Sequence, residues 1–276
     1  MLFKKNKFRG ASTNYELDDL PNTRRKQFID ILKLHFLQMI KIGFFLFLGF
    51  IPYLGVKFSF DFYVSTLNAP NEILIANYYY TLINVPAIIL FFLVISGLLK
   101  IMIRYAWAQP VFYKEDFITG VKENWTSSIL FALIIGLINI IRAILTLYQI
   151  NVYVSTAIFS VSLVFIYPLL FVFTFVNAIY VNPFLKNISI ALRLLIRRFP
   201  LFLVFFLLCY AFTFIDYIPS MVIKYTAYLI ALIILVPIAW LASTLFSLSV
   251  FDELINKNRY CSLFQRGLRS SFERKK

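Results

Sequence analysis

Arg142 is the residue of this chain that most needs a chemical partner, because it stands deep inside a long apolar segment. A guanidinium group in a membrane span either turns out toward the interface or meets a compensating charge within the protein. In the first case Arg142 has no specific role. In the second case we expect it to be balanced by Asp216 or by an anionic ligand. Asn139, three residues earlier on the same helical face, adds polarity and completes a candidate intramembrane polar site.

A second group of polar residues favours protein binding. The segment FITGVKENW, residues 117–125, carries Phe117, Val121 and Trp125 at helical spacing. A basic amphipathic helix of this kind places its apolar face in the membrane interface and its polar face in water. Such a helix either only anchors the neighbouring spans or also offers its polar face to a partner. The candidate docking residues are Lys122, Glu123 and Asn124 in this segment, and Arg193 and Arg197 in a similar segment further along the chain.

Residue types suited to catalysis or metal binding are scarce. The chain has one histidine, His35, and two cysteines, Cys209 and Cys261, without CxxC spacing. No glycine-rich phosphate loop is visible, and the 13 acidic residues avoid the centres of the apolar runs, where a proton-coupled transporter usually places one. We therefore expect a non-enzymatic protein without a metal or other cofactor.

The elements that must position these residues are membrane helices. With 61% hydrophobic and 14% charged residues, the chain has more apolar surface than a soluble core of this length can bury. Uncharged runs mark the spans, since roughly 20 residues cross a bilayer. The run 143–185 has room for two spans, with a turn near 149–151. We predict six helices, at 36–56, 77–99, 127–149, 153–177, 200–218 and 225–250.

The orientation follows from the distribution of the 27 lysines and arginines. Segments 1–35, 100–126, 184–198 and 251–276 hold 8, 4, 4 and 7 of them, and six spans place these segments on one side. By the positive-inside rule that side, with both termini, is the cytoplasm. The net charge of +14 then sets topology and binds anionic lipid, and no segment is long enough for a nucleic-acid-binding domain. We expect no cleavable signal, because the first apolar run follows a charged segment and lacks a small-residue cleavage site.

A short pattern recurs four times on the predicted cytoplasmic side. It consists of a large apolar residue, two free positions, a glycine or aliphatic residue, an aliphatic residue and a cation. Its copies are FIDILK at 28–33, FITGVK at 117–122, ISIALR at 188–193 and FQRGLR at 264–269. The first three lead into helical hairpins whose second helices contain Pro86, Pro168 and Pro237. We therefore expect three repeats of an amphipathic helix, named an elbow helix from here on, plus a hairpin, with a fourth elbow helix after them.

The predicted fold class is an all-α polytopic bundle of six transmembrane helices with cytoplasmic termini. The chain divides into a basic segment at 1–27, a membrane domain at 28–250 and a basic tail at 251–276. Three glycines, Gly43, Gly49 and Gly55, are expected at close helix contacts.

Two segments resemble the YesL-like membrane proteins of Gram-positive bacteria. GLLKIMIRYAWAQPVFYKEDFITGVKENWTSSIL, residues 97–130, is similar to the central region of that family, and NPFLKNISIALRLLIRRFPLFL, residues 182–203, is similar to its second elbow helix. The shared features are Gly97, Arg104, Tyr105, Asp116, Phe117, Asn124 and Trp125. The resemblance implies a multi-pass protein of a Gram-positive plasma membrane, in a family often associated with carbohydrate uptake systems.

The expected function is that of a non-enzymatic accessory or regulatory subunit of a transport system. Its partners would be the bilayer with its anionic lipid and a membrane or cytoplasmic protein of a transporter complex, with no nucleic acid. The alternative is an autonomous transporter or channel for small molecules or lipids. Because no nucleotide-binding motif is present, an ATP-driven activity would need another chain.

Overall fold

The structure, a computed structural model, describes residues 20–273, which form helices and turns without a strand. The parts of the predicted basic segments at 1–19 and 274–276 lie outside the described residues. The helices are α1 (Arg24–Ser65), α2 (Pro70–Ala106), α3 (Tyr113–Leu147), α4 (Val152–Val161), α5 (Tyr167–Ile179), α6 (Phe184–Arg197), α7 (Phe199–Tyr210), α8 (Met221–Ile230), α9 (Val236–Phe251), α10 (Lys257–Arg259) and α11 (Arg269–Glu273). Short π-helical segments join α4 to α5, α8 to α9 and α9 to α10, and a 3₁₀ segment, Ala211–Tyr217, follows α7.

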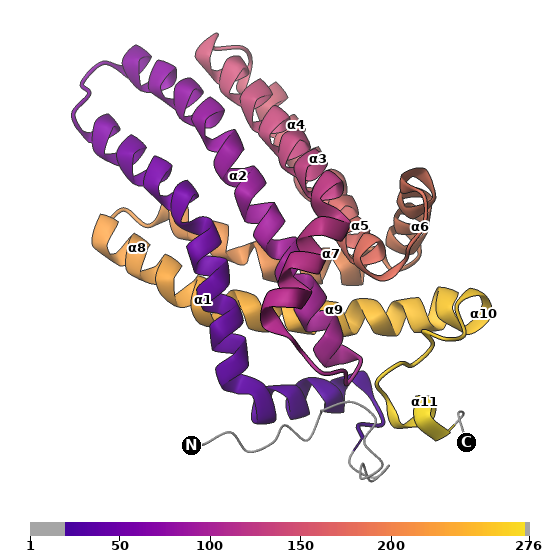
Figure 1. Ribbon diagram of the computed structural model, residues 1–276. Helices are drawn as coiled ribbons and strands as arrows, with labels where there is room; N and C mark the ends of the chain where they lie inside the picture. Colours follow the sequence, from indigo (N-terminus) through magenta and orange to yellow (C-terminus); the bar gives the residue numbers. More distant parts are fainter. Residues whose placement is uncertain (1–19, 274–276) are drawn as a thin grey trace, which may run out of the picture.

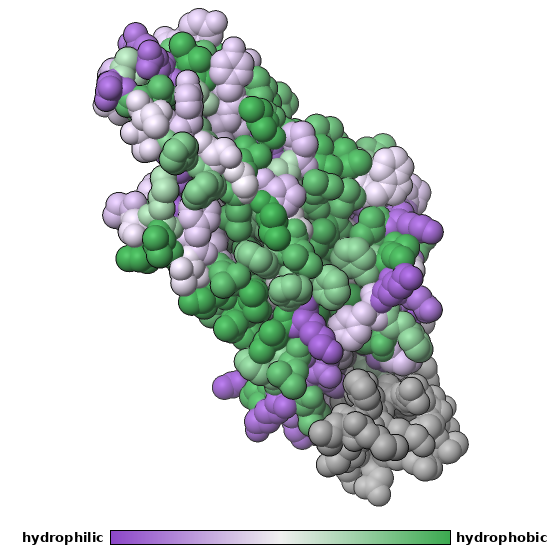
Figure 2. Space-filling model, turned by 60° about the vertical axis from the view of Figure 1, so that its left-hand side comes forward, coloured by the Kyte–Doolittle hydropathy of each residue, from purple (hydrophilic) through white to green (hydrophobic). Residues whose placement is uncertain are grey.

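Six helical stretches are long and apolar enough to cross a membrane. They are Arg24–Ser65, Pro70–Ala106, Tyr113–Leu147, Val152–Ile179, Phe199–Tyr217 and Met221–Arg259. Each predicted span falls on one of these stretches, so the prediction of an all-α fold with six candidate spans is confirmed. Figure 2 shows hydrophobic residues covering the middle of the visible face, with hydrophilic residues gathered toward its two ends.

The candidate spans pack as tilted hairpins (Figure 1). Helix α2 packs mainly against α3 and α1, and α9 lies against α1, α7 and α2. The long helix that contains α8 and α9 crosses α1. The start of α1 and the C-terminal helix α11 lie at the same end of the bundle, where the Arg269 N–H donates to the Pro21 carbonyl at 3.1 Å. We call this the elbow end, because the first elbow segment lies there.

The first three predicted elbow segments are helical, but they join their spans in different ways. The first segment is the start of α1, which bends at His35, where φ is −127° and ψ is 24°. The second continues into the rest of α3 without a break. The third is α6, which is separated from α7 at Arg198, where φ is −132° and ψ is 33°.

The prediction of a fourth elbow helix at 264–269 is wrong. This segment forms turns, and α11 begins only at its last residue. Gly267 has a φ of +85°, and a Cβ at this position would collide with the backbone of Ala106 and Trp107. The Arg266 guanidinium lies 4.4 Å from the centroid of the Trp107 ring. The segment is therefore shaped by its packing over the end of α2 rather than by helical periodicity.

Two of the three predicted internal prolines follow a π-helical turn. The segment Ser162–Ile166 precedes Pro168, the segment Ala231–Leu235 precedes Pro237, and Pro86 lies inside α2. Proline has no N–H for the carbonyl four residues earlier, and its ring clashes with that carbonyl. A widened turn just before the proline accommodates the ring without ending the helix.

Close helix contacts occur at two of the three glycines predicted to make them. A Cβ at Gly43 would overlap the Ile233 carbonyl, and a Cβ at Gly49 would lie 2.7 Å from the Val94 side chain. The same position at Gly55 has no neighbour within 4 Å. Gly43 and Gly49 thus let α1 approach its two neighbours closely, and the prediction for Gly55 is wrong.

Candidate functional site: an aromatic cavity between the spans

A cavity of about 220 Å³ lies between the candidate spans. Its wall is mainly aromatic and includes Phe50, Phe91, Phe171, Phe206, Phe212 and Trp240. The rings also contact one another: the centroids of Phe50 and Phe91 are 4.8 Å apart, and those of Phe171 and Trp240 are 5.6 Å apart. Such a wall suits a ligand with an apolar body, because aromatic rings offer it a large apolar contact area.

A few polar groups interrupt this wall. Asn139, one of the predicted intramembrane polar residues, lines the cavity together with Thr213 and Tyr210. The Thr213 hydroxyl donates its hydrogen to the Tyr210 carbonyl at 2.9 Å, so this hydroxyl can only accept a hydrogen bond from a ligand. The Asn139 amide brings both donors and an acceptor to the wall. These groups can orient a ligand that has one polar end.

Arg142 does not contact Asp216, so the predicted pairing of these two residues is wrong. The guanidinium carbon of Arg142 lies 4.4 Å from the ring centroid of Phe159 in α4. Within residues 20–273 Arg142 makes no ion pair. The negative face of the ring compensates the cation by a cation–π interaction within the α3–α4 hairpin.

Asp216 belongs to a cluster of four charged residues at the end of the bundle opposite the elbow end. Lys57 Nζ lies 2.6 Å from Asp61 Oδ1 and 3.9 Å from Asp216 Oδ1, and Lys224 Nζ lies 3.0 Å from Asp61 Oδ2. Two cations and two carboxylates make the cluster neutral. Tyr228, which lines the cavity, interacts with the Asp216 carboxylate, so the cluster adjoins the cavity wall. Of these ion pairs, only Lys57–Asp61 could be predicted from the sequence, because residues four apart on a helix lie side by side.

The second elbow segment faces the bundle with the side that carries Asn124. Its buried residues include Asp116, Gly120, Asn124 and Ser128, at four-residue spacing, whereas Trp125 is 52% exposed. Small residues allow close approach of α2, and polar side chains in a membrane protein must find partners within the protein. The prediction that Asn124 faces water is therefore wrong.

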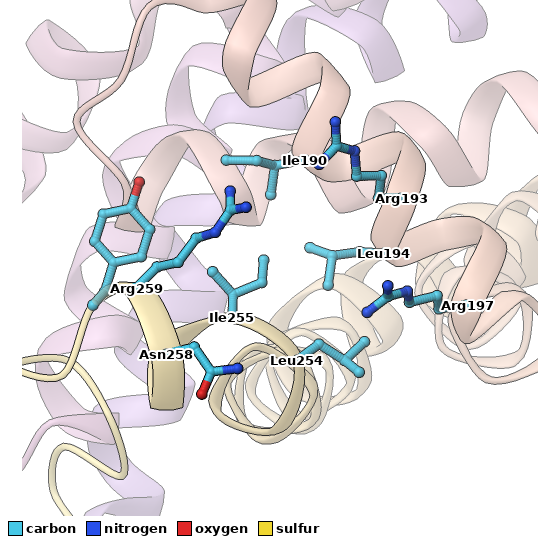
Figure 3. A pocket seen from close by; sticks show the side chains of 9 residues that line it. Ile190, Arg193, Leu194, Arg197, Leu254, Ile255, Asn258 and Arg259 are labelled. Atoms are coloured by element: carbon cyan, nitrogen blue, oxygen red, sulfur yellow. The ribbon is translucent and has the colours of Figure 1, made fainter.

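The other four predicted docking residues lie at the surface. Lys122 is exposed, and Glu123 accepts a hydrogen bond of 2.6 Å from Lys100 Nζ in α2. Arg193 and Arg197 are exposed on α6 and line one pocket (Figure 3). The structure thus brings the two arginines together and leaves Lys122 and Glu123 on a separate helix.

A chain of buried hydrogen bonds, which was not predicted from the sequence, joins the elbow segments. Arg24 in α1 donates to Asp252 Oδ2 at 2.9 Å, and Asn256 donates to Asp252 Oδ1 at 2.8 Å. The Tyr180 hydroxyl donates to Asn256 Oδ1 at 2.6 Å. Burial, followed by the Asp252 charge, raises the pKa of the Tyr180 hydroxyl, so this group remains a donor at neutral pH.

Asparagines continue the chain of hydrogen bonds to α3. Asn187 in α6 donates to the Tyr180 carbonyl at 3.3 Å and to Asn177 Oδ1 at 3.1 Å. Asn177 donates to Asn124 Oδ1 at 2.6 Å, and Asn124 donates to the Gly120 carbonyl at 3.1 Å. The available signal was the recurrence of asparagine at the ends of apolar runs, where an unpaired amide is costly.

Several residues of the family resemblance fix the turn between α2 and α3. Arg104 Nε lies 3.2 Å from Asp116 Oδ1, and the Phe112 N–H donates to Asp116 Oδ2 at 2.8 Å. The hydroxyls of Tyr105 and Tyr113 share a hydrogen bond of 2.6 Å. These contacts position the start of α3.

The fold and the cavity define a class of protein: an all-helical chain with six helices long and apolar enough to cross a membrane, and with a mainly aromatic internal cavity. No family model, curated protein or solved structure matches this chain.

Proposed function

We propose that this chain is a non-enzymatic membrane component of a transport system, and that its own part is to bind an apolar or amphipathic small molecule between its spans. The observation that carries the proposal is the cavity of about 220 Å³ with its mainly aromatic wall. Aromatic rings supply a large apolar contact area, and a few convergent polar groups fix the orientation of a ligand.

The charges beside the cavity favour an uncharged ligand. Lys57 and Lys224 already face Asp61 and Asp216, so the cluster offers no net charge to an ion. The wall is mainly apolar, and its polar groups are Asn139 and scattered tyrosine and threonine hydroxyls, which suits a ligand with a large apolar body. A role in carbohydrate uptake, which the family resemblance implies, would therefore belong to a partner that carries the sugar.

We also infer three elbow-plus-hairpin repeats. The register set by the recurring pattern aligns positions that are buried in all three copies. These are Gln27, Asp116 and Asn187; Ile31, Gly120 and Ala191; and Ile42, Phe131 and Phe202. At matching places, each copy buries first a polar residue, then an apolar or small residue, and then a large apolar residue. This shared order supports a repeated packing unit.

The elbow end is proposed to be cytoplasmic, in the plasma membrane of a Gram-positive bacterium. The excess of lysine and arginine in the segments of this end supports this orientation. The bacterial assignment follows from the family resemblance.

Two roles in transport remain distinct candidates. The exposed elbow cations Lys122, Arg193 and Arg197 favour an accessory subunit, because they offer charged surface to a partner. The cavity favours an autonomous carrier. An accessory subunit should bring transporter subunits with it on purification, whereas an autonomous carrier should exchange its ligand across liposomes that contain this chain alone.

The binding proposal is tested with a cavity-filling variant and a matched surface variant. Ile135→Phe adds a ring to the cavity wall, and Leu133→Phe adds the same ring at an exposed position of the same helix. The probe is a medium-chain alcohol with a photoreactive diazirine, and mass spectrometry locates the labelled peptides. We expect saturable labelling of cavity residues in the original protein and in Leu133→Phe, and its loss in Ile135→Phe. Equal labelling of all three proteins would overturn the proposal.

A further inference from the structure

A basic pocket with a volume of about 230 Å³ lies between α6 and the end of the last long helix. Arg193 and Arg197 line it from α6, and Arg259 lines it from α10. Figure 3 shows these side chains around one space, with Arg259 on one side and the two α6 arginines on the other. Each guanidinium group presents a planar set of donors that matches the oxygens of a phosphate.

The three arginines have no anionic partner among the side chains of residues 20–271. No acidic residue lines the pocket either. Two other arginines do have acidic partners, since Arg198 pairs with Glu253 and Arg24 pairs with Asp252. The positive charge of the pocket is thus available to a ligand.

The floor of the same pocket is aliphatic. Ile190 and Leu194 of α6 are buried beneath the arginines, and Leu254 and Ile255 complete the floor from the other helix. The uncharged run of this helix ends at Phe251, directly before Asp252 and Glu253, so the pocket lies just beyond the end of the apolar region. A ligand that matches the whole pocket has an anionic head and an apolar body.

Contacts on both sides of the pocket hold its walls in place. Arg198, directly after α6, pairs with Glu253, and the Tyr260 hydroxyl donates to Asn182 Oδ1 at 3.1 Å. These two links join the segments before and after α6 to the end of the last long helix. The pocket is therefore formed before a ligand arrives, which lowers the entropy lost on binding.

We propose that this pocket binds the phosphate of one anionic phospholipid, with the lipid chains beside the aliphatic floor. A phosphodiester in the headgroup layer meets the three arginines at the level where the last span ends. Free inorganic phosphate shares the anion chemistry but leaves the floor uncovered, and an acidic protein segment is the competing macromolecule.

The test uses the purified full chain in a neutral detergent and counts bound lipids by native mass spectrometry. The probes are phosphatidylglycerol, phosphatidylcholine, inorganic phosphate and a polyglutamate peptide. The pocket variant replaces Arg193, Arg197 and Arg259 by Gln, and the matched control replaces the exposed cations Arg25, Lys114 and Lys122 by Gln. Both variants lose the same formal charge.

We expect the original protein and the control variant to retain one phosphatidylglycerol more tightly than phosphatidylcholine. The pocket variant should bind that lipid on the order of 100-fold more weakly, at about fivefold per arginine. Equal weakening in the control would overturn the proposal, because the effect would then reflect net charge alone. Displacement of the lipid by millimolar inorganic phosphate would also overturn it, as would tight binding of polyglutamate in place of the lipid.

A second variant keeps the proposal testable if the Gln variant does not fold. Replacing the three arginines by Lys preserves the charge but removes the paired donors of each guanidinium. Thermal unfolding of this variant should match that of the original protein. Its phosphatidylglycerol affinity should be lower than that of the original protein, but by less than the loss of about 100-fold expected for the Gln pocket variant. An unchanged affinity would mean that charge alone holds the lipid, which contradicts a shaped phosphate site.

Discussion

Arg24 of α1 and Asp252 of the last long helix form a buried ion pair, with 2.9 Å between Arg24 Nη2 and Asp252 Oδ2. The side chains are only 9% and 8% exposed. Arg24 also donates to the Ala106 carbonyl at 3.3 Å and to the Arg266 carbonyl at 3.0 Å. One guanidinium group thus joins the start of α1, the end of α2 and the C-terminal segment.

Arg24→Leu should strongly destabilise the protein, because it leaves the Asp252 carboxylate buried without its cation. We expect the free energy of unfolding to fall by about 3–5 kcal/mol. Thermal unfolding in one detergent measures the change, and Arg25→Leu is the control, since Arg25 is exposed. If the two variants melt at the same temperature, the ion pair does not hold the elbow end together.

Gly43→Ala should destabilise the protein, whereas Gly55→Ala should not. The added Cβ at Gly43 overlaps the backbone carbonyl of Ile233, which cannot rotate away as a side chain could. Overpacking of this kind costs about 1–3 kcal/mol. Gly55 has no neighbour within 4 Å, and alanine is the better helix former there by up to about 1 kcal/mol. Similar melting temperatures for the two variants would contradict the close contact between α1 and the segment around Ile233.

The spans could be predicted from the sequence, because the bilayer imposes a length and an apolar composition on each helix. The partner of Asp216 could not be predicted from the sequence, because it depends on how α1 and α8 approach Asp216 in space. A similar expected depth in the spans suggested Arg142 as one possible partner, but the ion pair of Asp216 is with Lys57. Similarly, Asn124 was predicted to face water because its segment was interpreted as an amphipathic helix in the membrane interface. In a membrane bundle the small and polar side of a helix often packs inward, and the apolar side faces lipid.

Part of the candidate site was also visible in the sequence. Asn139 was expected in an intramembrane site and does line the cavity. The aromatic wall was not predicted, since the phenylalanines and tyrosines of the apolar runs have no pattern that separates cavity-facing from lipid-facing rings. The turns around Gly267 were mistaken for a helix, because a six-residue pattern carries no information about packing against the end of α2.

Arg142→Leu and Phe159→Leu should each lower the stability by about 0.5–2 kcal/mol, the range of a cation–π contact. The double variant should lose less than the sum of the two, because both changes remove the same interaction. Thermal or denaturant unfolding of the four proteins measures this coupling. A matching cycle between Arg142→Leu and Asp216→Asn should show no coupling. Coupling in that second cycle would show that Arg142 and Asp216 do interact.

Labelling of single cysteines tests the proposed orientation. In a Cys261→Ser background, which leaves only the buried Cys209, new cysteines replace Ser65, Thr119 and Ser189 at exposed positions. A membrane-impermeant maleimide should label position 65 from outside intact cells, and positions 119 and 189 only after the membrane is opened. External labelling at 119 would contradict both the six-span topology and the cytoplasmic elbow end.

Fluorescence of Trp240 tests the binding role of the cavity most directly. The variant Trp107→Phe with Trp125→Phe leaves Trp240, in the cavity wall, as the single tryptophan. A second protein, with Trp107→Phe and Trp240→Phe, leaves the exposed Trp125 and reports nonspecific partitioning of the ligand. The quencher is a dibrominated medium-chain alcohol, which has an apolar body and one small polar end.

We expect saturable quenching of Trp240, abolished by adding Ile135→Phe to the same protein, and only a linear, unsaturated response from Trp125. Linear quenching of Trp240 that parallels the response of Trp125, and that Ile135→Phe leaves unchanged, would contradict the proposed ligand-binding role.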